Sequence, residues 1–221
     1  MASDPWIRWS WIGPHLGLIR SELAQHLELT AVAVGLGLVI ALPLAWAAWH
    51  WSWITGPVLG LSGLLYTIPS LALFSLLVPV FGLSAVTAEF GLVGYTLLIL
   101  IRNTVTGLAS VPPEVREAAR AMGYTPLRQL AKVDFPLSLP AILAGLRIAT
   151  VTTIGLVSVT ALIGEGGLGQ LFIDGFQRDF KTPLMVGLIL SVILALGADL
   201  LLVGAQRLVT PWARRAEPGA G

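Results

Sequence analysis

The sequence lacks cysteine altogether, and only 11% of its 221 residues are charged. Without cysteine the chain forms no disulfide and no thiolate metal or redox site, and its three histidines have no metal-ligand spacing. A soluble protein usually has about 25% charged residues, so a water-soluble fold is a poor explanation. The net charge of +1 provides no basic patch of the kind that nucleic-acid binding needs. We therefore expect no metal centre and no nucleic-acid partner.

Long hydrophobic runs take the place of charge. The hydrophobic fraction is 56%, and no Asp, Glu, Lys or Arg occurs from Leu29 to Ala88. About 20 apolar residues cross the hydrocarbon core as a helix, so this stretch is long enough for two crossings. The sequence predicts an all-α polytopic membrane protein with about five transmembrane helices, at approximately residues 27–48, 58–80, 89–108, 139–163 and 183–203.

The remaining segments are polar or aromatic. Residues 1–25 include Trp6, Trp9 and Trp11 and suit an interfacial segment, because indole rings favour the headgroup region. Residues 26–209 form the predicted transmembrane domain, with a polar loop at about 110–136, and residues 210–221 form a tail. The five predicted spans place eight basic residues on one side of the membrane: Arg102, Arg116, Arg120, Arg128, Lys132, Arg207, Arg214 and Arg215. The other side carries four: Arg8, Arg20, Arg178 and Lys181. The positive-inside rule then predicts a cytoplasmic loop and C-terminus and an external N-terminus, within a cytoplasmic (inner) membrane.

The polar loop has the signals of a helix, a turn and a second helix. Pro112 and Pro113 precede an acidic first turn, Gly123 is expected to end the first helix, and Thr125 and Pro126 start the second. The small residues Ala118, Ala119 and Ala121 would let the first helix sit closely in a groove on the surface of a partner protein. Around them Glu117, Arg116 and Arg120 are expected to make rim contacts, which mainly set orientation and partner choice.

The loop contains Glu117-Ala118-Ala119, three residues, Gly123, nine residues, and Val133-Asp134-Phe135-Pro136. This string resembles the EAA loop of ABC importer permeases, with Val133 and Phe135 replacing the family's Ile and Leu. The resemblance implies a type I ABC importer permease fold whose coupling helix docks on a cytoplasmic ATPase. The alternative is a solvated amphipathic helix without a partner.

The chain has no phosphate-binding loop of its own. Its only lysines, Lys132 and Lys181, are not preceded by the glycines that such a loop requires. We therefore expect no enzymatic activity in this chain, and the resemblance implies that ATP and Mg are used by a separate ATPase subunit.

Further strings narrow the resemblance and are found, in order, at residues 66–74 (YTIPSLALF), 102–108 (RNTVTGL), 143–147 (LAGLR) and 163–169 (IGEGGLG). Together they look like the glycine betaine, carnitine and choline permeases of osmoprotectant uptake systems. That resemblance implies two ATPase subunits, a second permease copy or paralogue, and an external substrate-binding protein. Methionine-type permeases share the five-span plan and are the alternative.

Pro69 interrupts the second predicted span and marks a candidate translocation pathway. Such breaks are tolerated where they line a cavity or pack on protein. The candidates are Tyr66, Thr67, Pro69 and Ser70, with the rings of Tyr66, Phe74 and Tyr95 available for cation-π contact with a quaternary ammonium cargo. The alternative is a plain proline kink whose Ser and Thr satisfy the backbone.

Two ionisable residues, Arg147 and Asp199, fall inside predicted spans at equal depth, which permits an ion pair. The alternative is that Arg147 snorkels while Asp199 faces a watery cavity. On the external side, Glu165, Gly166 and Gly167 are candidates for a gate or a binding-protein contact, and otherwise form a turn.

Two other functional classes stay open. One is a channel, which would conduct without ATP. The other is an intramembrane enzyme using Glu165, Asp174 or Asp199 as acid or base, which is disfavoured because no nucleophile, His-acid set or metal motif accompanies them.

Overall fold

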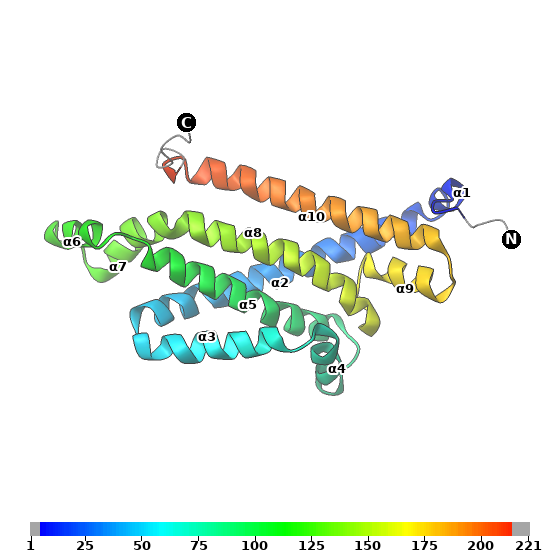
Figure 1. Cartoon of the computed structure of the whole chain (residues 1–221), viewed down its shortest axis with the longest axis horizontal. Helices are drawn as coiled ribbons and strands as arrows, with labels where there is room; N and C mark the ends of the chain where they lie inside the picture. The colour runs from blue at the N-terminus through cyan, green and yellow to red at the C-terminus, as the bar shows by residue number, and fades with distance from the viewer. Residues whose placement is uncertain (1–4, 214–221) are drawn as a thin grey trace.

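The structure is a computed structural model that describes residues 5–213. Helices make up almost all of this part of the chain (Figure 1). In order they are α1 (Trp9–Ile12), α2 (Leu16–His50), α3 (Ser52–Thr67), α4 (Ser70–Phe81), α5 (Ala85–Ala109), α6 (Pro113–Ala121), α7 (Pro126–Gln129), the π-helical turn η1 (Leu130–Asp134), α8 (Phe135–Thr160), the 3₁₀ turn η2 (Ala161–Ile163), α9 (Gly169–Gln177) and α10 (Lys181–Val209).

Four helical segments within residues 5–213 are long and apolar enough to cross a membrane. They are α2, α5, α10 and the continuous segment Pro126–Ile163, which contains α8. The bent pair α3 and α4 makes a fifth if it counts as one span. An all-helical membrane protein with about five spans is therefore confirmed.

The first span begins earlier than the sequence predicts. Helix α2 starts at Leu16 instead of near residue 27, and it continues unbroken through residue 25, where the interfacial segment was expected to end. Its first turns contain Leu, Glu, Ala and Gln, which favour helix. With 35 residues it is about 52 Å long, so it extends well beyond a hydrocarbon core of about 30 Å.

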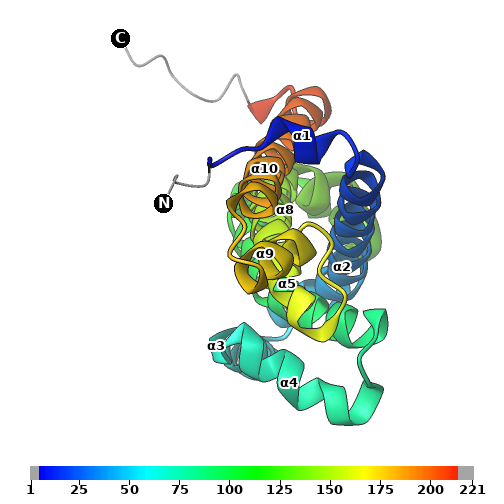
Figure 2. The same ribbon diagram turned by 90° about the vertical axis from the view of Figure 1, so that its right-hand side faces the viewer.

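The second span is not the single helix that residues 58–80 predict. Helix α3 ends at Thr67, α4 begins at Ser70, and the two axes differ by 97°. The break follows from Pro69, which has no N–H and pushes Ile68 into an extended conformation (φ −66°, ψ 127°). Figure 2 shows the result, with α4 turned across the bundle.

Helix α5 is the centre of the bundle. It packs against α2 on one side and α8 on the other, and α10 lies along α8 (Figure 1). One core cluster includes Leu29, Phe74 and Leu92. The other includes Leu100 and Ala149. Helices α5 and α8 approach most closely where a Cβ on Gly145 would lie 2.5 Å from the Cβ of Asn103.

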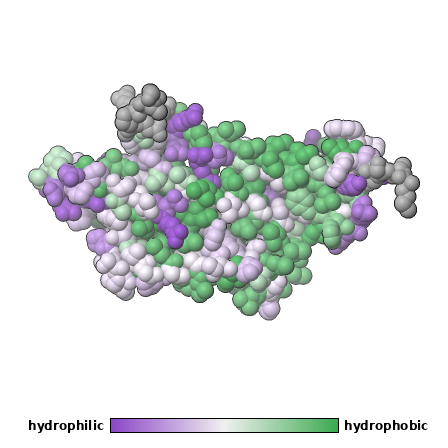
Figure 3. All heavy atoms as spheres, viewed as in Figure 1, coloured by the Kyte–Doolittle hydropathy of each residue, from purple (hydrophilic) through white to green (hydrophobic). Residues whose placement is uncertain are grey.

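Polar segments lie at the two ends of the long axis. Helices α6 and α7 are at one end, and α1 and α9 are at the other (Figure 1). Figure 3 shows hydrophilic side chains over α6 and near α9, with a largely hydrophobic surface between them. This distribution matches a protein that spans a bilayer along its long axis.

The close approach of α5 and α8 predicts that Gly145→Ala destabilises the bundle by about 1–3 kcal/mol, because the added methyl overlaps Asn103. Gly155→Ala is the matched control on the same helix, since a Cβ there meets nothing within 4 Å. Thermal unfolding of both variants in detergent micelles checks this. Equal midpoints for the two would contradict it.

Candidate functional site

Helix α6 projects from the end of the bundle, between α5 and α8. It begins after Pro112, with Pro113 in the first turn. It ends in a Schellman motif, in which the Gly123 N–H donates to the Arg120 carbonyl (2.9 Å) and the Tyr124 N–H donates to the Ala119 carbonyl (3.1 Å). This motif requires a left-handed residue, and Gly123 has a φ of +78°.

The exposed face of α6 carries two alanines among charged side chains. Glu117, Ala118 and Ala121 are exposed, and Ala119 is buried against the loop. A helix with alanine on its outer face can approach another protein surface closely. The structure therefore leaves this part of the EAA string free for a partner.

Two large apolar side chains flank the end of α6. Met122 is 66% exposed and Leu127 is 74% exposed, although both lie at the polar end of the molecule. Exposed apolar groups that cluster on a polar surface are typical of an interaction site. The sequence analysis did not single out either residue.

Arg116 faces the interior of the loop. Its Nε donates to Asp134 Oδ1 at 2.8 Å, and its Nη2 donates to the Leu108 carbonyl at the end of α5. Its guanidinium lies 4.8 Å from the ring centroid of Trp49, near the end of α2. Arg116 thus joins α6 to α2, α5 and the start of α8, instead of standing at the rim where it was expected.

Asp134 accepts hydrogen bonds from two residues of the loop, Arg116 and Gln129. It is almost fully buried, and its Oδ2 accepts from Gln129 Nε2 at 3.2 Å, while Gln129 Oε1 accepts from Arg120 Nε at 3.4 Å. Asp134 ends the π-helical turn, which Pro136 explains because its ring and missing N–H disturb the preceding helical hydrogen bonds. The fold therefore buries a carboxylate where the membrane-spanning helix begins.

The predicted pathway residues separate into two groups. Tyr66, Thr67 and Pro69 are exposed beside the break, and the ring of Tyr66 meets that of Tyr95 at 5.9 Å. Tyr95 is buried and its hydroxyl donates to the Ile68 carbonyl, so it satisfies a backbone group at the break. Ser70 begins α4.

Phe74 lies elsewhere. It is 1% exposed and belongs to the core cluster with Leu29 and Leu92, so its ring does not face a path in this structure.

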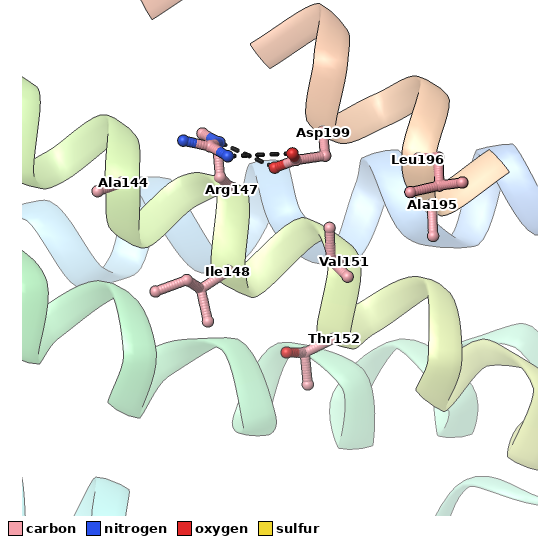
Figure 4. A pocket seen from close by; sticks show the side chains of 8 residues that line it. All are labelled: Ala144, Arg147, Ile148, Val151, Thr152, Ala195, Leu196 and Asp199. Atoms are coloured by element: carbon pink, nitrogen blue, oxygen red, sulfur yellow. Dashed lines mark hydrogen bonds and ion pairs between the residues drawn. The ribbon is translucent and has the colours of Figure 1, made fainter. Parts of the chain in front are cut away.

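Arg147 and Asp199 form a two-pronged ion pair between α8 and α10 (Figure 4). Arg147 Nε lies 2.8 Å from Asp199 Oδ1, and Nη2 lies 3.0 Å from Oδ2. The side chains are 33% and 32% exposed, and they face a groove of about 480 Å³. The two side chains are thus paired and also open to a ligand or solvent.

The glycine-rich loop at the opposite end is held against α2. Gln25 Nε2 donates to Glu165 Oε2 at 2.8 Å, and Gln25 Oε1 accepts from the Gly167 N–H at 2.9 Å. Gly166 and Gly167 are buried, whereas Glu165 is partly exposed. Of the three candidates, only Glu165 offers a side chain to the surface at this end of the molecule.

The residues that the structure describes contain no group of three or more His, Cys, Asp or Glu that could hold a metal. The carboxylates weighed for acid-base chemistry have different partners: Gln25 for Glu165, Arg178 for Asp174 at 2.7 Å, and Arg147 for Asp199. They do not form a shared catalytic centre.

Sequence reasoning missed most of the loop's supporting residues. Trp49, Gln25 and Gln129 belong to no motif that the sequence reveals. Asp134 had one available signal, because it is a charged residue between Val133 and Phe135 in an otherwise apolar string. Only the fold shows that it meets Arg116.

Removing one partner of the Arg116–Asp134 pair is expected to cost more than removing both. Arg116→Met leaves a buried, uncompensated Asp134 and should destabilise the permease by about 3–5 kcal/mol. The double variant Arg116→Met/Asp134→Leu removes the stranded charge and should recover much of that loss. Denaturation in mixed micelles measures both, and a double variant as unstable as the single one would refute the pairing argument.

Comparison with known proteins agrees with these features. The chain is 40% identical over 203 residues to the osmoprotectant import permease protein OsmW of Salmonella typhimurium, covering 88% of this chain and 93% of that protein. It is 36% identical over 159 residues to the glycine betaine/carnitine/choline transport system permease protein OpuCD of Bacillus subtilis, covering 72% and 69%.

The fold is similar to a solved structure of the MetNI methionine ABC transporter in an inward-facing conformation, with a TM-score of 0.76, 24% identity, and coverage of 89% of this chain and 98% of that one. A family model described as the binding-protein-dependent transport system inner membrane component matches residues 33–215. The chain therefore belongs to the family of inner membrane components of binding-protein-dependent transport systems.

Proposed function

We propose that this chain is the permease subunit of an ATP-driven importer that carries a compatible solute such as glycine betaine, carnitine, choline or proline betaine. The names of the two relatives support this cargo class. Methionine or another amino-acid derivative is the alternative cargo. ATP and Mg are used by a separate ATPase, because this chain carries no phosphate-binding loop.

The proposed assembly is two-fold. A second permease copy or a paralogue completes the pore, two ATPase subunits bind at the cytoplasmic end, and a substrate-binding protein delivers the solute externally. In this orientation α1 is external and the end of α10 is cytoplasmic, in keeping with the excess of basic residues at that end. Residues 26–209 would be the transmembrane part, and of the proposed cytoplasmic tail, residues 214–221 lie outside the described residues.

One observation supports the coupling mechanism: α6 exposes Glu117, Ala118 and Ala121 on one face, while its Arg116 contacts α2, α5 and the η1 turn before α8 on the other. Glu117, Ala118, Ala119 and Gly123 would form the docking element, with Met122 and Leu127 as apolar anchors and Arg120 at the rim. When the ATPases close, they would move α6, and Arg116 would pass that movement to α2, α5 and α8.

On the external side, we propose that Glu165 contacts the binding protein or a gate, with Gly166 and Gly167 placing it against α2. Within the membrane, Tyr66, Thr67, Pro69 and Ser70 would line the pathway, and Tyr95 would hold the break in place. Phe74 would reach a passing solute only if the core opened around it.

The apolar anchors can be tested directly. Leu127→Asp should weaken retention of the ATPase on affinity-purified permease by about tenfold, because a charge replaces a desolvated hydrophobic contact. Phe176→Asp is the control, since Phe176 is equally apolar and 83% exposed but lies on α9 at the other end. If both variants retain the ATPase as the unaltered permease does, Leu127 is not an anchor.

Uptake of radiolabelled glycine betaine by vesicles containing the permease, its ATPase and its binding protein tests the whole proposal. We expect uptake only with ATP, loss of uptake with Gly123→Trp, and retention with Gly123→Asn, because Asn tolerates the left-handed conformation at the end of a helix. A Cβ at Gly123 meets nothing within 4 Å, but its φ of +78° strains any side chain there, so the Asn variant is needed to separate backbone strain from obstruction of docking by the Trp ring. Uptake without ATP would indicate a channel, and ATP-dependent uptake of methionine alone would overturn the proposed cargo.

A further inference from the structure

The ion pair between α8 and α10 lies deep inside the proposed membrane span. Arg147 is half-way along α8, which runs from Phe135 to Thr160. Asp199 is in the second half of α10, which runs from Lys181 to Val209. Ionised side chains at this depth are costly and mark binding or transport sites in membrane proteins.

The pair is not sealed by its own chain. A third of each side chain is exposed, and both line the groove of about 480 Å³ between α8 and α10 (Figure 4). Lipid tails would leave the exposed charged atoms without polar neighbours, which is unfavourable in hydrocarbon. This face must therefore meet water, another polypeptide or a polar solute.

The lining of the groove is mostly apolar and holds one charge of each sign. Among the eight described residues around it, Arg147 and Asp199 alone are charged, while Ala144 and Ala195 leave room beside them. Thr152 adds a hydroxyl for which the described residues show no hydrogen-bond partner. The site thus combines one cation, one anion and free volume.

Both charged groups keep unused bonding capacity. Arg147 donates from Nε and Nη2 to Asp199, and a guanidinium has five N–H donors in all. The Asp199 oxygens likewise have lone pairs left over. A carboxylate can take a place on the guanidinium with the same two-pronged geometry, while an ammonium group lies against the aspartate.

We propose that Arg147 and Asp199 form a transient binding station for zwitterionic cargo, meaning solutes that carry both a carboxylate and a quaternary ammonium group. The inference rests on the proposed function, because it specifies which solutes the importer distinguishes. The groove lies on the α8 and α10 side of the bundle, away from the break between α3 and α4, so the proposal places this station on a different part of the path from Tyr66 (Figures 1 and 2). Between passages the two residues neutralise each other, so the empty groove holds no stranded charge. During passage the solute exchanges ionic contacts with the pair, which keeps binding weak enough for release.

This station treats glycine betaine and choline differently. Glycine betaine has both charges, whereas choline has the ammonium group alone. The carboxylate contact belongs to Arg147, and the ammonium contact belongs to Asp199. Replacing Arg147 should therefore lower the ratio of glycine betaine to choline uptake, and replacing Asp199 should raise it.

The test measures ATP-dependent uptake of labelled glycine betaine and of labelled choline by reconstituted vesicles. Arg147→Gln should lower the ratio of glycine betaine to choline uptake by about tenfold, since only glycine betaine loses a contact. Asp199→Asn should raise the ratio, because choline then meets an unpaired Arg147. Leu208→Ala, on α10 but outside the groove, should leave the ratio unchanged.

A purely structural ion pair gives another result. Both single variants would then lower the two uptake rates in proportion, and an unchanged ratio would overturn the proposal. If the unaltered transporter imports neither solute, the proposed cargo fails and this inference fails with it.

If the Arg147→Gln variant does not assemble, a second variant can be measured in its place. Arg147→Lys keeps the positive charge but loses the two parallel N–H donors, so the ratio should still fall, by a smaller factor. The exchanged pair Arg147→Asp/Asp199→Arg provides a second measurement, because it keeps both charges and should restore assembly and both uptake activities. No shift of the ratio in the lysine variant would count against the station.

Discussion

The interior of a bilayer offers no hydrogen-bonding partners, and most features of this chain follow from that constraint. Backbone groups in the spans are bonded within helices, and the polar segments lie at the two ends of the long axis. Where Pro69 interrupts a span, the hydroxyl of Tyr95 meets the carbonyl of Ile68. Where two charges enter the membrane, they meet each other. At these two places a side chain compensates for the departure from a simple apolar helix.

The same constraint separates two kinds of charged contact. Arg116 and Asp134 lie at the polar end, where burial in the loop makes the pair a fixed joint between α6 and the bundle. Arg147 and Asp199 lie at membrane depth but remain partly open. The first pair suits transmission of force from a partner, and the second suits reversible contact with a passing solute.

In the proposed mechanism, coupling and transport use different parts of one packed core. Helix α5 packs against both α2 and α8, so a displacement of α6 reaches the helices around the pathway through side chains that are already in contact. The close approach at Gly145 keeps α5 and α8 together along this route. The bend between α3 and α4 lies beside α5 and α8.

The sequence by itself determined the helical membrane class, the approximate places of the long apolar helices and the presence of a polar loop between α5 and α8. Hydrophobic runs and clustered charges are local signals, and the bilayer translates them directly into position. It also placed the end of α6 at Gly123, since the left-handed turn depends on that residue alone.

Only the tertiary structure decided which distant side chains meet. The 97° bend exceeds what a proline in a span predicts, because its size depends on the helices packed around it. Residues far apart in the chain meet where Arg116 turns inward, where Phe74 is buried and where Gln25 hydrogen-bonds to Glu165. Such contacts depend on how helices pack against each other, and helix packing is a property of the assembled bundle that no single segment encodes.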